Sequence, residues 1–223
     1  HLSAYHIGFV IGPCLNAGGR LDTAKRALEL LRASSRREAD LLAGDLKALN
    51  DSRKEMTQEG VEEAVKMVET TALQEDKVLV IFLPDCHESL AGIIAGRIRE
   101  RYHKPVFILT KAEQGAKGSG RSIENYDMYE EMSKCKALFT KFGGHKMAAG
   151  LSLPEENIEV FRRQLNEKTV LTEEDFCEKV SIDNADATPI CDRGTGRGTG
   201  TSGTVWKRKY ETGFCRKRYA CPK

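Results

Sequence analysis

The sequence predicts an α/β protein in which a long helix precedes a domain of alternating strands and helices. The helical pattern runs from about residue 36 to 68 without a proline. From about residue 74 to 168, short apolar runs alternate with amphipathic stretches, which is typical of a sheet covered by helices. The 223 residues, 40% hydrophobic and 30% charged, suffice for one large or two small globular domains.

The segment before the long helix, residues 4–33, begins with an apolar run that we expect to break at Gly12 and Pro13. A helix is expected after this break, with Asp22 or Thr23 as its N-cap. Apolar residues recur there at helical spacing: Ala24, Ala27, Leu28, Leu30 and Leu31.

The long helical pattern has apolar residues that are separated by charged ones. Gly44 and Gly60 interrupt it, each at a cost of about 1 kcal/mol, which a helix of this length tolerates. A helix this long and this polar usually bridges domains instead of filling a single core. We therefore interpret it as a connector.

The α/β region contains the expected elements in regular succession. Strands are expected in residues 77–84, 104–110 and 148–153, and helices in residues 89–102, 126–142 and 154–168. Pro154 suits the first turn of the last helix, and the acidic residues after it suit the positive end of the helix dipole.

The net charge of +2 hides a basic C-terminal tail. From Cys191 onward, nine Lys and Arg residues stand against two Asp and Glu residues, so the preceding part is net acidic. Nucleic-acid binding by the folded part would therefore depend on local patches. The low-complexity tail is either a disordered basic arm for a polyanion or a misread reading frame. We favour the second, because codons exist for its Gly-Thr repeats that a one-nucleotide shift converts into an acidic, leucine-rich helix.

The apolar runs are too short to span a membrane and no leader-like segment is visible, so we expect a cytoplasmic protein without a membrane partner. No two of the seven cysteines show C-x-x-C spacing, so no zinc site is expected. His87 and Glu88 lack the second histidine of a zincin motif. We interpret them as packing or substrate-contact residues.

The stretch KFGGHKMAAG, residues 141–150, is the first candidate site. Its small residues would let backbone N–H groups approach a phosphate closely, and its histidine and lysine would add hydrogen bonds. The candidate contact residues are Gly143, Gly144, His145, Lys146, Ala148, Ala149 and Gly150. A tight helix-to-strand turn, with the histidine bound to a buried carbonyl, is an alternative that composition leaves open.

The stretch KGSGRS, residues 117–122, is the second candidate site. Lys117, Ser119 and Arg121 alternate along an extended stretch, so their side chains would share a face. A guanidinium beside a hydroxyl suits a terminal phosphate, because its planar fork engages two oxygens together. A polar hairpin edge is the alternative.

The stretch CLNAGGRLD, residues 14–22, is the third candidate site. It places Asn16 and Arg20 around two glycines just before an expected helix N-terminus, a position that favours anions. A plain helix-entry loop is the alternative, and these residues alone favour it.

These stretches, in their order along residues 4–190, closely resemble the RecJ-type exonucleases of the DHH/DHHA1 phosphoesterase family. The segments that carry the resemblance are GPCLNAGGRLDTAKRALELL, HESLAGIIAGRI, KGSGRS and KFGGHKMAAGLSLPEENIEVFRRQLNE. The resemblance implies a single-stranded-DNA-specific 5′-to-3′ exonuclease that acts in DNA repair and recombination. In that family, aspartates and histidines of a DHH domain hold Mn²⁺ or Mg²⁺.

The resemblance also implies a domain order. Residues 1–33 would be the last part of a DHH domain, 34–73 the connecting helix and 74–168 the DHHA1 α/β domain. Residues 169–190 would begin an OB-fold region, and 191–223 would be a basic tail that is out of frame. The shifted-frame reading of this tail resembles the start of the family's OB-fold region.

By the same resemblance, Arg20, Ser119 and Arg121 would hold the 5′-terminal phosphate of single-stranded DNA. Supporting contacts would come from Asn16, His87 and Lys117. The residues of the KFGGHKMAAG stretch would line a cleft opposite the metals and contact the DNA backbone. The sequence contains no Asp-His-His triplet, so we expect this chain to hold no metal and to be inactive alone.

Two other functions compete with this interpretation. One is a smaller DHH/DHHA1 phosphodiesterase that acts on short RNA or cyclic dinucleotides, against which the long connector and the OB-like continuation argue. The other is a non-catalytic DHHA1 nucleic-acid-binding module like that of alanyl-tRNA synthetases. The CLNAGGRLD stretch and its following helix argue against that module.

Overall fold

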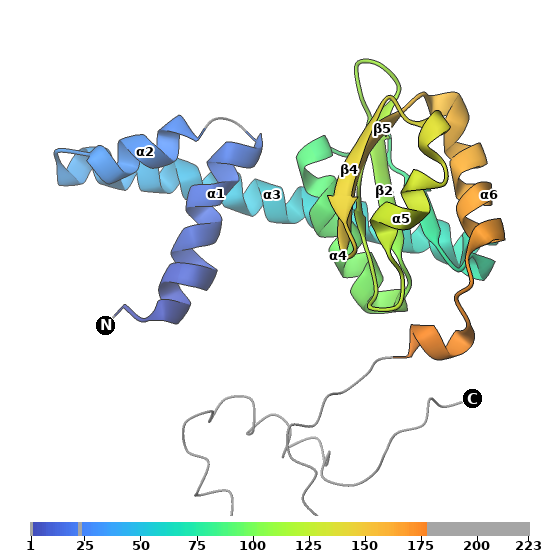
Figure 1. Ribbon diagram of the computed structural model, residues 1–223. Helices are drawn as coiled ribbons and strands as arrows, with labels where there is room; N and C mark the ends of the chain where they lie inside the picture. The colour runs from blue at the N-terminus through green and yellow to red at the C-terminus, as the bar shows by residue number, and fades with distance from the viewer. Residues whose placement is uncertain (1, 22–23, 178–223) are drawn as a thin grey trace, which may run out of the picture. The chain divides into compact units, whose positions relative to one another are not determined.

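The computed structural model describes residues 2–21 and 24–177, which form an N-terminal group of helices followed by a sheet with helices on both faces (Figure 1). The predicted α/β class, with a long helix before the sheet, is confirmed. The basic tail and most of the expected OB-fold segment lie outside the described residues. Within the described ranges, no helix combines the length and the apolar character needed to cross a membrane.

The N-terminal helices differ from the prediction. A π-helical turn, His6–Ile11, leads directly into helix α1, Gly12–Leu21, so the expected break does not occur. The Gly12 N–H donates to the Ile7 carbonyl, and we attribute the continuity to this wider turn, which makes room for the following Pro13 ring. Helix α2, Lys25–Arg32, begins without a side-chain cap, and the two residues expected to cap it lie outside the described ranges.

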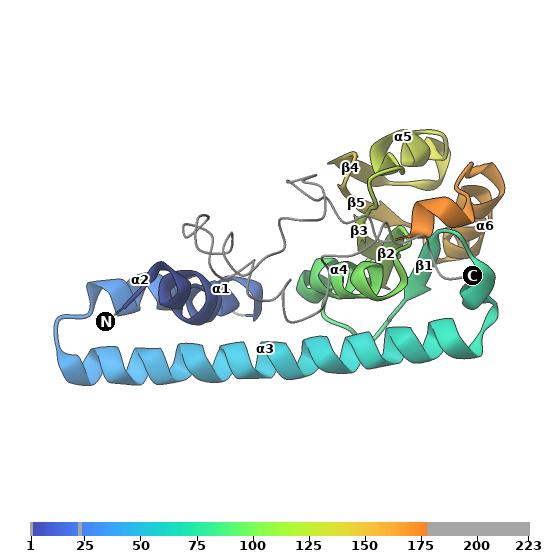
Figure 2. The same ribbon diagram turned by 90° about the horizontal axis from the view of Figure 1, so that it is seen from below.

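Helix α3 spans Arg36–Thr70, so the predicted long helix is confirmed. Its N-cap is Ser35, whose hydroxyl accepts the Glu38 N–H at 3.2 Å. Helices α1 and α2 pack along its first part, and helix α4, Ala91–Tyr102, packs near its other end (Figure 2). Gly60 permits the second contact, because a Cβ there would lie 2.6 Å from Ile94 Cδ1.

The sheet has five strands in the order β1-β2-β3-β5-β4. Their bounds are β1 Leu79–Phe82, β2 Val106–Lys111, β3 Ala116–Arg121, β4 Lys141–His145 and β5 Ala148–Leu153. Strands β1 and β2 are parallel and joined through α4, whereas the other three pairings are antiparallel.

Alternating side chains divide the core into two layers. Phe107 of β2 belongs to a cluster with helices α5, Met128–Ser133, and α6, Ile158–Lys168. Its neighbour Ile108 belongs to a second cluster, with α3 and α4. The predicted helix over residues 126–142 is too long. Helix α5 ends at Ser133, and the later residue Phe139 packs edge-on against Phe161 of α6, with the ring centroids 5.1 Å apart.

Asn166 of α6 closes the free edge beside β1. Its Oδ1 accepts the N–H groups of Lys77 at 2.8 Å and Val78 at 3.0 Å, and its Nδ2 donates to the Val78 carbonyl at 3.0 Å. One side chain thus satisfies three backbone groups where the sheet would otherwise end unpaired.

Replacing Asn166 with alanine should lower the free energy of unfolding by about 1–3 kcal/mol, because a buried N–H and carbonyl lose their partners. Urea denaturation of the full chain measures this change. The matched control is Gln164→Ala on the same helix, whose side chain accepts a hydrogen bond from the exposed Lys168 and bonds no backbone group of the described residues. Equal effects of the two substitutions would contradict the assigned role of Asn166.

Candidate nucleic-acid interface

The KFGGHKMAAG stretch is a β-hairpin. Strands β4 and β5 pair from Lys141↔Ser152 to His145↔Ala148, so both the expected glycine loop and the alternative helix-to-strand turn are wrong. The connecting turn is held from outside, since the Ser122 N–H donates to the Met147 carbonyl at 2.9 Å. The segment is extended and paired, and it does not form a nest of successive N–H donors.

The sheet register brings the two glycine-rich stretches together. In antiparallel pairs, residues directly opposite each other project from the same face. Three rows therefore cross β3, β5 and β4 in turn: Arg121–Ala148–His145, Ser119–Gly150–Gly143 and Lys117–Ser152–Lys141. We call these nine residues the open face. The intervening residues of β5 project the other way, into the core beside α6.

The middle of the open face is bare. Helix α4 packs on β2 and β3 on this side of the sheet. A Cβ added to Gly143 would meet nothing within 4 Å, and one added to Gly150 would meet only the Gly118 carbonyl oxygen at 3.9 Å. A flat ligand can therefore approach the backbone of β4 and β5 closely.

Arg121 and Ser119 lie at the border between the open face and α4. The Arg121 Nη1 donates to the Gly120 carbonyl at 2.7 Å. A Cβ added to Gly92, in the first turn of α4, would lie 2.7 Å from Arg121 Nη2 and 3.6 Å from Ser119 Cβ. The guanidinium and the hydroxyl therefore share one corner, as the alternation predicts. The alternative of a hairpin edge is wrong, because β3 is an interior strand.

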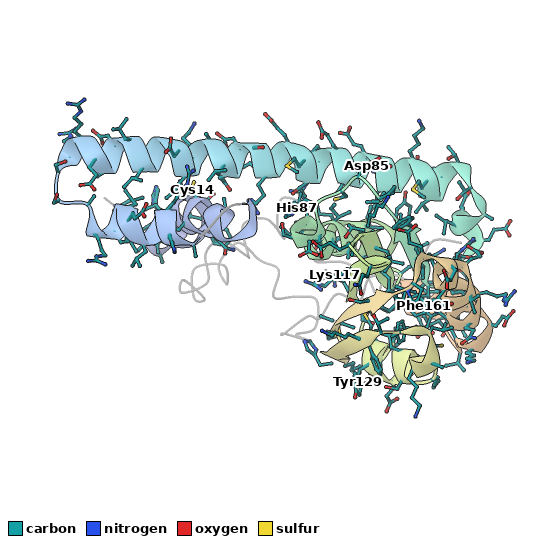
Figure 3. The ribbon with its side chains drawn as sticks, turned by 90° about the horizontal axis from the view of Figure 1, so that it is seen from above. Cys14, Asp85, His87, Lys117, Tyr129 and Phe161 are labelled. Atoms are coloured by element: carbon teal, nitrogen blue, oxygen red, sulfur yellow. The ribbon has the colours of Figure 1, made fainter. Side chains whose placement is uncertain are left out.

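A second group of polar side chains lies beside this corner, where η3, Glu88–Leu90, leads into α4. Lys117 Nζ lies 2.9 Å from a carboxylate oxygen of Glu88, in a half-exposed ion pair. His87 Nδ1 lies 2.7 Å from the Ser89 hydroxyl and accepts the Ser89 N–H. Figure 3 labels His87, the N-cap of η3, and Lys117 of β3. Lys117 lies two residues from Ser119 on the same face of β3, and its ion pair with Glu88 joins this strand to the residue that follows His87.

His145 ends β4 at the far side of the open face. Its Nδ1 accepts the Met147 N–H at 3.3 Å. In the neutral imidazole the proton then resides on Nε2, which is left as a donor for a ligand. Lys146 follows in the turn with its side chain exposed. Among the residues that the structure describes, His145 has no carbonyl partner, contrary to the alternative interpretation.

The third candidate stretch is helical, which corrects its prediction as a helix-entry loop. Asn16 and Arg20 both lie in α1, where backbone N–H groups already serve the helix. The buried Ala17 and Gly18 let α1 approach α3. Asn16 is exposed, and α1 contacts η3 beside the corner of Ser119. The phosphate-binding role of Arg20 stays a prediction.

Within residues 2–21 and 24–177, no three side chains of His, Cys, Asp or Glu gather to hold a metal. The sequence interpretation also missed three residues of the site, namely Gly92, Lys141 and Ser152. Recognising KFGGH as a strand would have placed Lys141 on the face of His145.

Comparison with known proteins identifies the fold. Residues 75–170 match the DHHA1 domain family. The RecJ single-stranded-DNA-specific exonuclease of Escherichia coli is 40% identical over 174 residues, which are 74% of this chain and 30% of that protein. Its counterpart in Bacillus subtilis is 36% identical over 181 residues, or 79% of this chain and 23% of that protein. The chain is a homologue of the RecJ exonucleases.

Solved RecJ structures have the same architecture. The Mg²⁺ complex of Thermus thermophilus RecJ has a TM-score of 0.67 and 31% identity, and covers 74% of this chain and 26% of its own. A RecJ exonuclease bound to manganese has a TM-score of 0.65 and 31% identity, with 74% and 41% covered. This RecJ homologue thus spans less than half of each relative that it matches.

The two glycines of the GGH motif should differ in their effect on stability. Gly144→Ala should lower the free energy of unfolding by about 1–3 kcal/mol, because its φ is +154° and a Cβ would collide with the Ala148 carbonyl oxygen. Gly143→Ala should change it by less than about 0.5 kcal/mol, since the added methyl enters open space. Urea denaturation compares the two variants. Equal destabilisation would contradict the register described for β4 and β5.

Proposed function

We propose that the open face binds the 5′-phosphorylated end of single-stranded DNA, as the DNA-holding part of a RecJ-type 5′-to-3′ exonuclease. The observation that carries this proposal is the common corner of Arg121 and Ser119 beside the bare Gly143–Gly150 row. Homology to proteins named single-stranded-DNA-specific exonucleases supports it.

The chemistry of the corner suits a terminal phosphate. A guanidinium donates two parallel hydrogen bonds to phosphate oxygens, and a hydroxyl beside it donates a third. The His145 Nε2 would donate to the same strand from the far side of the face. Side chains that contact phosphates alone carry no sequence information, so binding should be independent of base sequence.

This proposal assigns binding, and not hydrolysis, to the chain. The sequence contains no Asp-His-His triplet, and the described residues offer no cluster of metal ligands. Metal-dependent cleavage, with its role in repair and recombination, would belong to an assembly that supplies such ligands. The relatives with bound Mg²⁺ or Mn²⁺ are proteins of which this chain spans only a part.

Arg121→Ala should remove the preference for a 5′-phosphorylated oligonucleotide over the unphosphorylated one. Loss of a charged hydrogen bond of about 1.5–3 kcal/mol corresponds to roughly a 10- to 100-fold loss of affinity. Fluorescence anisotropy with both oligonucleotides measures the preference. Arg163→Ala, which removes an exposed guanidinium from α6, is the control and should leave it unchanged. If the unmodified chain binds both oligonucleotides equally, the proposal fails.

Gly92→Ala should weaken binding of the 5′-phosphorylated strand several-fold, because a methyl group there displaces the Arg121 guanidinium. Gly96→Ala, four residues later in the same helix, is the matched control, since its Cβ would meet nothing within 4 Å. The unphosphorylated strand should bind both variants alike. An unchanged phosphate preference in Gly92→Ala would show that α4 does not position Arg121.

A further inference from the structure

We propose that Lys141 and Ser152 bind the second phosphate of the strand, at the first internucleotide linkage. This inference rests on the proposed function, because it takes the corner of Arg121 and Ser119 as the place of the terminal phosphate. It adds a binding subsite on the hairpin to that corner.

The geometry comes from the register of β3, β5 and β4. Lys141 lies opposite Ser152, which in turn lies opposite Lys117. This row is one step beyond the row of Ser119, and successive rows on one face are about 7 Å apart, twice the rise per residue of an antiparallel strand. Neighbouring phosphates of an extended single strand are separated by a comparable distance. Ser152 lies one row and one strand from Ser119, a diagonal of about 8 Å given strands about 4.8 Å apart. A strand fixed at Ser119 would therefore bring its next phosphate to Ser152, within reach of the long side chain of the adjacent Lys141.

Charge distinguishes Lys141 from the other lysine of the row. The Lys117 ammonium is already engaged by the Glu88 carboxylate at 2.9 Å. Lys141 is exposed, and its ammonium has no carboxylate partner within the described part of the chain. It is thus the cation of this row that remains available to an anion.

Ser152 contributes a hydroxyl beside this cation. Its carbonyl is occupied by the N–H of Thr140 at 2.9 Å and by the Thr140 hydroxyl at 3.1 Å. These bonds hold the backbone where β5 meets β4, and they leave the Ser152 side chain free to face the ligand. An ammonium and a hydroxyl on adjacent paired residues can engage one phosphate together.

The path between the two phosphate positions is unobstructed. It starts in the row of Ser119, whose other residues are Gly150 and Gly143; neither has a side chain, and the space above Gly143 is empty. The sugar and linkage between the two phosphates can therefore lie against the backbone. The strand would run diagonally, from Ser119 on β3 toward Ser152 on β5 and Lys141 on β4.

A thermodynamic cycle with a modified oligonucleotide tests this inference on the full chain. The probes are 5′-phosphorylated trithymidylate and the same molecule with a neutral methylphosphonate at its first internucleotide linkage. The modification should weaken binding to the unmodified protein about 10- to 100-fold, as expected for loss of one charge-assisted contact. It should have no effect on Lys141→Ala, and a smaller effect on Ser152→Ala than on the unmodified protein.

Salt dependence gives a second measurement. Lys141→Ala should reduce the slope of log affinity against log salt concentration by about 0.7, the value for one phosphate contact with a single strand. Lys66→Ala, which removes an exposed lysine from α3, should leave both the slope and the methylphosphonate effect unchanged.

The outcomes separate this inference from the proposed function. If the methylphosphonate weakens binding equally with and without Lys141, the second-phosphate site is wrong. The terminal-phosphate site still stands in that case, provided Arg121→Ala abolishes the preference for the 5′-phosphate. If no 5′-phosphate preference exists in the unmodified protein, both proposals fall together.

Discussion

The pairing of β5 with β3 on one side and β4 on the other is the constraint on which the interface depends. A slip of one residue would turn Arg121 or His145 into the core and bring apolar side chains to the open face. Two core-facing positions also oppose such a slip, because only glycine fits there and a slip would place a residue with a side chain in the same space. A Cβ at Gly120 would lie 2.8 Å from the Phe107 ring, and one at Gly144 would lie 2.6 Å from Ala149 Cα.

The helices cover the two faces of the sheet unequally. Helices α5 and α6 cover one face, where buried aromatic and aliphatic side chains supply the core. On the other face, α3 and α4 pack on a second core formed with β1 and β2. Helix α4 also reaches β3 and thus borders the strip of small residues on β5 and β4. The same helix therefore contributes to the core and positions Arg121 through Gly92.

Glycine has distinct roles at neighbouring positions of this surface. Gly144 is required by its backbone conformation and by the close approach of β5. Gly143 has open space above it, so an added side chain there would cover part of the open face without a clash in the fold. A side chain at Gly92 would have an intermediate effect on the fold. It would collide with the Arg121 guanidinium, which can move aside, and not with backbone atoms. Glycines on one surface thus meet different physical requirements.

The sequence by itself determined the elements with strong apolar periodicity, namely α3, α4, α6 and the strands β1, β2 and β5. It also placed Lys117, Ser119 and Arg121 on one face, since alternation is a local property of an extended chain. The hairpin at KFGGH escaped prediction, because glycines carry no hydrophobic pattern from which to recognise a strand. Only the tertiary structure decided that Arg121 and His145 share a row. It also decided that Gly92 of α4 lies next to the Arg121 guanidinium. The pairing of strands depends on contacts between residues distant in the chain, which no local pattern specifies.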